Sequence, residues 1–137
     1  MAGNIFCKAS GDGWNVRNTL FDLIVGFAFE KFFNKSRAPN LTKKLEDDLG
    51  YFLRTGWPEK YKDNLGGSYR VVVLDDFPAG ELMVFRDALS AVVHAFRHDK
   101  VSDDIGAVPE YFEQLARLTG ELIDVVESVI RSKKEEL

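Results

Sequence analysis

The chain has 137 residues, of which 45% are hydrophobic and 29% are charged, and its formal net charge at pH 7 is −4. This length suits a single domain spanning residues 1–137, and the composition excludes a wholly disordered chain. The negative charge argues against nonspecific nucleic-acid binding, because phosphate contacts need a basic surface. The single cysteine, Cys7, cannot form an internal disulfide, so we expect a reducing, cytoplasmic compartment.

The chain opens with a stretch that favours a short strand. Within residues 3–9, Ile5 and Cys7 fall on one face of an extended chain and Phe6 falls on the other. The glycines that follow, in SGDGWN, are typical of a turn. A basic region followed by a long apolar run is not seen here, so we expect no secretory signal.

The most hydrophobic segment, residues 20–33, contains five of the eleven phenylalanines. We predict that it forms a helix, which begins at a cap, either Asn15 or Asn18, and ends near Asn34. Apolar side chains cover most of this helix, so we expect it to lie at the centre of the fold.

Charged residues interrupt this central helix at Asp22 and Glu30. A membrane span needs about 20 predominantly apolar residues, so we predict no membrane segment. Phe29 and Phe33 lie beside the polar stripe that contains Asp22. We expect the other helices to leave these two rings partly uncovered, as an apolar contact surface.

A second helix is expected from an N-cap at Asn40 to a C-terminal glycine at Gly56, with Pro58 preventing its continuation. Its apolar residues recur at helical spacing; they are Leu41, Leu45, Leu49, Phe52 and Leu53. This spacing predicts one buried face along the whole helix.

The consecutive valines of residues 70–74 favour a strand, and an isolated strand cannot satisfy its backbone groups. We therefore expect this segment to pair with residues 3–9. Two further amphipathic helices are predicted at about residues 79–98 and 109–133. Together these elements predict a mainly α fold, a four-helix, up-and-down-like bundle with a small two-stranded β element.

A homodimer is a further expectation from the apolar surfaces. The last helix carries a long apolar stripe from Phe112 to Ile130, and the first helix is apolar nearly all round. Four helices leave part of these two surfaces uncovered on this interpretation, and a second copy of the chain would cover them.

The third predicted helix contains two histidines at i and i+4, His94 and His98, which point the same way. Asp87 falls between them in azimuth, so the three residues form a geometrically possible metal-ligand face. The core-facing residues of this helix lie roughly opposite, however, and a solvated polar face is the simpler interpretation. We assign no catalytic residue and no cofactor, and keep Asp87, His94 and His98 as candidate metal ligands.

The twelve residues 99–110 resemble a calcium-binding loop only in part. They begin with Asp and end with Glu, as such loops do, but Val101 occupies the third position, where an oxygen ligand is needed. Asp104 occupies the sixth position, where the turn requires glycine. We therefore interpret this segment as a surface turn.

Aromatic and basic residues alternate after the second helix, where Trp57, Tyr61 and Tyr69 surround Lys60 and Lys62. Such a mixture is typical of a contact with a protein or a single-stranded nucleic acid. The alternative is that Trp57 packs back on the second helix, which leaves the two tyrosines as candidate contacts.

Acidic residues gather in the second half of the chain, at Asp75, Asp76, Asp99, Asp103 and Asp104. An acidic patch gives fast, salt-sensitive association with a basic partner. We therefore predict a small acidic protein-binding module that occupies a partner's surface, as inhibitors, immunity proteins and antitoxins do. The alternative is a metal-dependent helical-bundle enzyme that uses the Asp87, His94 and His98 face.

Overall fold

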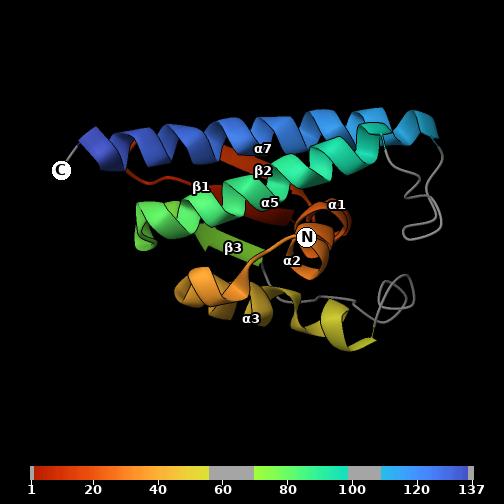
Figure 1. The fold of residues 1–137 in the computed structure, drawn as a ribbon, viewed down its shortest axis with the longest axis horizontal. Coiled ribbons are helices and arrows are strands. Elements are labelled where there is room, and N and C mark those ends of the chain that lie inside the picture. The colour runs from red at the N-terminus through yellow and green to blue at the C-terminus, as the bar shows by residue number, and fades with distance from the viewer. Residues whose placement is uncertain (1, 56–69, 99–108, 136–137) are drawn as a thin grey trace.

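The computed structural model describes residues 2–55, 70–98 and 109–135 (Figure 1). These residues are mainly helical, as predicted, and include a three-stranded sheet. The elements, in chain order, are β1 (Ala2–Phe6), β2 (Gly13–Arg17), α1 (Asn18–Phe21), a π-helical turn (Asp22–Gly26), α2 (Phe27–Lys31), α3 (Pro39–Thr55), β3 (Arg70–Val73), α5 (Ala79–His98) and α7 (Pro109–Glu135).

The sheet has the strand order β2-β1-β3. The central strand β1 pairs in parallel with β3, from Gly3 opposite Arg70 to Phe6 opposite Val73, so the predicted pairing of the two segments is confirmed. The prediction of two strands is wrong, because β2 pairs antiparallel with the other edge of β1. This strand has only two buried side chains, too few to reveal a strand beside the glycine-rich turn.

Those two buried residues, Trp14 and Val16, alternate with exposed ones along β2 and face the core. The indole Nε1 of Trp14 donates a hydrogen bond to the main-chain oxygen of Leu118, at 2.9 Å. Ile5 and Cys7, predicted to share one face of this strand segment, are both buried. The sheet is thus attached to α7 by both apolar packing and a directed hydrogen bond.

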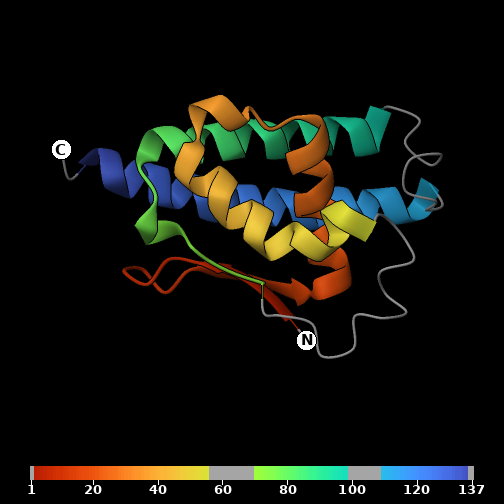
Figure 2. The same ribbon diagram turned by 90° about the horizontal axis from the view of Figure 1, so that it is seen from below.

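The central hydrophobic segment forms one helical stretch from Asn18 to Lys31, with the π-helical turn in its middle. Figure 2 shows this stretch running across α5 and α7 rather than alongside them, so the predicted up-and-down bundle is not confirmed. The predicted exposure of Phe29 and Phe33 is also wrong, since they are 1% and 8% exposed. The Lys35 ammonium lies 4.6 Å from the Phe29 ring centroid, and Phe85 packs edge-on against Phe33.

Helix α3 begins at Pro39, a favoured first position because proline lacks the amide hydrogen that would go unused there. Asn40 is therefore inside the helix and not its N-cap, which corrects the prediction. The cap comes instead from Glu81, a buried residue on α5. Its carboxylate accepts hydrogen bonds from the Leu41 amide and from the side-chain amide of Asn40, both at 2.9 Å.

Helices α5 and α7 lie side by side and antiparallel (Figure 1), and both begin at the predicted residues. The apolar stripe of α7 is largely buried inside the chain, with Phe112, Leu115 and Val126 all in the core. The expectation that part of this stripe stays uncovered holds only for Leu118 and Val125, which are half-buried. This stripe therefore does not by itself indicate a homodimer.

Buried apolar residues from the sheet and from all the helices form one cluster. Phe32 is the exposed large hydrophobic residue of the described chain, and its ring still packs edge-on against Phe27, 5.6 Å away. Within the described ranges, every helix is too short or too polar to cross a membrane.

Candidate functional site

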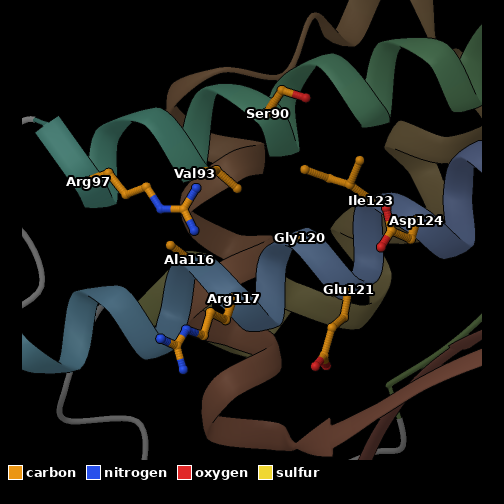
Figure 3. A pocket seen from close by; sticks show the side chains of 9 residues that line it. All are labelled: Ser90, Val93, Arg97, Ala116, Arg117, Gly120, Glu121, Ile123 and Asp124. Carbon is orange, nitrogen blue, oxygen red and sulfur yellow. The ribbon is translucent and has the colours of Figure 1, made fainter.

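An open groove of about 550 Å³ runs between α5 and α7 on the outer surface (Figure 3). We call it the α5–α7 groove. Its lining residues come from both helices: Ser90, Val93 and Arg97 from α5, and Ala116, Arg117, Gly120, Glu121, Ile123 and Asp124 from α7. The antiparallel packing of two long helices creates this groove, because their side chains meet below it and diverge above it.

The floor of the groove is built from small and apolar residues. Ala116 is buried, and Val93 and Ile123 are half-buried on either side of the interhelical space. Gly120 lies one turn after Ala116, in the interior of α7, where glycine costs about 0.5–1 kcal/mol relative to alanine. Apart from its two chain neighbours and the nearby backbone of its own helix, a Cβ at Gly120 would meet no atom of the described residues within 4 Å. Packing within the described fold therefore does not require a glycine here.

One end of the groove is basic. Arg97 and Arg117 both contact the carboxylate of Glu113, at 3.2 Å and 3.7 Å, so two guanidinium groups share one carboxylate. Arg117 extends from α7 in the direction away from α5 (Figure 3), and its side chain is 74% exposed, which leaves its charge at the surface. This end therefore carries an excess of positive charge.

The other end of the groove is acidic. Glu121 and Asp124 are both exposed and both line the groove. Asp124 follows Arg117 by seven residues, which on an α-helix places the two side chains on the same face and about 10 Å apart. The groove thus has an apolar floor and a charge that changes sign along its length.

Asp75, a predicted partner contact, is bound within the chain. Its carboxylate accepts hydrogen bonds from the amides of Lys8 (2.7 Å) and Ala9 (3.2 Å) and from the Cys7 thiol (3.6 Å). Partial burial favours a raised pKa for Asp75, but these hydrogen bonds outweigh it and hold the pKa below the ordinary value of 3.8. The Asp75 main-chain oxygen also accepts a hydrogen bond from Lys133 Nζ, at 3.0 Å.

Asp75 thus attaches the β1–β2 turn to the segment before α5, and its neighbour Asp76 is exposed. The other predicted contacts, Asp103 and Asp104, lie outside the described residues. The same is true of the aromatic candidates Trp57, Tyr61 and Tyr69.

The candidate metal ligands lie on the outward face of α5. His94 and His98 are exposed, and their ring centroids are 4.7 Å apart. Asp87 is 72% exposed and pairs with Arg86 at 3.1 Å. Among the described residues, no three histidine, cysteine, aspartate or glutamate side chains are grouped so that they could hold a metal ion.

The groove residues were missed by sequence reasoning because each has an ordinary place on an amphipathic helix. Two signals were present in the sequence: a glycine inside a strong helix, and opposite charges at the seven-residue spacing of Arg117 and Asp124. Comparison of the chain with protein-family models, with curated proteins and with solved structures gave no match. The functional argument therefore rests on the geometry of the groove.

Proposed function

We propose that the chain is a protein-binding module and that the α5–α7 groove is its contact surface. The observation that carries this proposal is Gly120, which leaves open space above the groove floor at a local cost in helix stability. Such a cost is expected where a partner's backbone must approach closely. A Cβ at this position would separate the two surfaces.

The shape of the groove favours an α-helix as the docked element. The groove follows the axes of two packed helices, and a third helix can lie along the same direction with its side chains between theirs. Its half-buried apolar residues, Val93 and Ile123, lie beside the buried Ala116 and give contact area at the centre. The charged residues form a polar rim, as in other protein interfaces.

The rim charges favour one of the two orientations in which a partner helix can lie along the groove. An acidic side chain is favoured near Arg97 and Arg117, and a basic one near Glu121 and Asp124. The opposite direction juxtaposes like charges and is disfavoured. The sequence-based hypothesis assigned the acidic contact surface to the segment around Asp75. We now propose the acidic end of the groove instead, because the Asp75 carboxylate is already hydrogen-bonded within the chain.

A photo-crosslinking amino acid at position 121 tests this proposal in cells. Position 46 on α3 is the matched control, since Glu46 is also an exposed glutamate on a helix. We expect a discrete protein crosslink from position 121 that is not formed from position 46. The crosslink should disappear when Gly120→Leu is added to the same chain, because the leucine fills the space above the groove floor.

Two results would contradict the proposal. One is that positions 121 and 46 give the same crosslinked species. The other is that Gly120→Leu leaves the crosslink from position 121 unchanged while circular dichroism shows that the variant is folded.

A further inference from the structure

We infer that the partner in the α5–α7 groove is a second copy of this chain, with the two α7 helices antiparallel across a two-fold axis near Gly120. This inference rests on the proposed function and names its partner. A two-fold axis makes one surface bind itself, so the surface must be complementary to its own rotated copy. The charges of Arg117 and Asp124 on α7 meet that condition.

Arg117 and Asp124 carry the charge symmetry that a two-fold axis requires. A two-fold axis between Gly120 and Glu121 places Arg117 opposite the partner's Asp124, and Asp124 opposite the partner's Arg117. The two residues lie within about 20° of each other around the helix, so both ion pairs form on the same face. A different protein could bind the groove with any complementary arrangement of charges. Only a second copy requires the groove itself to carry both members of the ion pair, and Arg117 and Asp124 are those two members.

The position of the axis also suits the dimer. It falls within one turn of the middle of α7, a helix of 27 residues that is about 40 Å long. Two antiparallel copies then overlap along most of their length. Gly120 lies where the two helix axes approach most closely, and the space beside it is open. An overlap of this length allows an interface of the usual size, about 800 Å² per partner.

Charge reversal gives a direct test. In Arg117→Glu, each ion pair becomes a repulsive contact between two carboxylates, and in Asp124→Arg it becomes one between two guanidinium groups. Exposed ion pairs contribute modestly, but every reversal replaces two symmetric attractions with two repulsions. We expect the dimer dissociation constant to rise about tenfold to a hundredfold in each single variant.

Mixing the two variants restores the match. The glutamate introduced at position 117 of one chain then faces the arginine introduced at position 124 of the other, and the unchanged Asp124 faces the unchanged Arg117. We expect a heterodimer to form more tightly than either variant's homodimer, as measured by sedimentation equilibrium and by native mass spectrometry with one variant isotope-labelled. Lys43→Glu and Asp47→Arg are the matched controls, since they change the charge by the same amounts at exposed positions on α3.

The possible outcomes are distinguishable. Wild-type protein that dimerises, is weakened by each groove reversal, and is rescued by mixing supports the inference. A monomer at every concentration, or a dimer affected equally by the groove and the α3 reversals, overturns it. If the chain is monomeric and position 121 crosslinks to a different protein, the second-copy partner is wrong and the protein-binding function stands. If the chain is monomeric and position 121 gives no specific crosslink, the second-copy partner and the protein-binding function are both wrong.

Discussion

Replacing Asp75 with asparagine removes the negative charge that holds the β1–β2 turn against the segment before α5. In the native chain this carboxylate accepts hydrogen bonds from two consecutive amides, those of Lys8 and Ala9, and from the Cys7 thiol. Asparagine has nearly the same shape but only one acceptor oxygen. The substitution therefore tests the charge and the second acceptor without opening a cavity.

Hydrogen bonds to charged groups contribute about 1.5–3 kcal/mol where water is excluded. Asp75 is only half-buried, and Lys8 and Ala9 are exposed, so water competes for the same groups and screens the charge. We expect Asp75→Asn to lower the free energy of unfolding by about 1–2 kcal/mol at pH 7. In a domain of this size that corresponds to a fall in Tm of about 3–8 °C.

The effect depends on pH in a definite direction. The folded-state pKa of Asp75 lies below the ordinary value of 3.8, so the unfolded chain takes up the proton first as the pH falls. The stabilisation is complete above about pH 5 and is lost as the pH falls through 3.8 towards the folded-state pKa. A protonated aspartic acid resembles asparagine, so the difference between wild type and Asp75→Asn should shrink as the pH falls below 3.8.

Urea unfolding followed by far-UV circular dichroism, between pH 7 and pH 2, measures this difference. Asp76→Asn is the matched control, because Asp76 is the adjacent residue and is exposed. Equal stabilities for Asp75→Asn and Asp76→Asn at pH 7 would refute the assignment of Asp75 as the attachment point. A stability difference that stays constant down to pH 2 would refute the role of its charge.

Three further substitutions test the contacts that define the fold. Glu81→Ala removes the carboxylate that caps α3 and leaves the amide of the buried Leu41 without its acceptor, so we expect the free energy of unfolding in urea to fall by about 2–3 kcal/mol. Glu81→Gln should recover part of this loss. Equal stability of the alanine variant and wild type would contradict the cap. Trp14→Phe removes the hydrogen bond to Leu118 and some packing volume, so we expect the free energy of unfolding to fall by about 1–3 kcal/mol by the same measurement. An unchanged value would show that other contacts hold the sheet to α7. Gly120→Ala should raise the free energy of unfolding of the monomer by about 0.5–1 kcal/mol, since the added Cβ meets open space in the single chain. The measurement is made at protein concentrations where both variants are monomeric, and a decrease there would show that the space is not available.

The elements that the sequence predicted well are those with strong local signals. Helix α5 and the start of α7 at Pro109 follow from apolar periodicity and from proline at a first helical position. The pairing of residues 3–9 with 70–74 followed from the need of an isolated strand for a partner. In each case the information lies within a few residues, or in a backbone requirement that any fold must meet.

The features that the sequence did not predict depend on residues far apart in the chain. Glu81 caps a helix that begins about forty positions earlier, and no local pattern connects the two. Phe33 is covered by Phe85 because the central helical stretch crosses α5 instead of running alongside it. The groove has the same origin, since it depends on the register of α5 against α7, which tertiary packing sets.

Gly120 connects these two kinds of information. Its helix-breaking tendency is visible in the sequence, but its meaning depends on what surrounds it in three dimensions. A helical glycine that packs against a neighbouring element is explained by that contact, and substitution there would cause a clash. At Gly120 the described fold offers no such contact, and the open space lies in a groove whose ends carry opposite charges. In the proposed function, a close approach from outside is the reason that Gly120 weakens its own helix and leaves room on the outer surface.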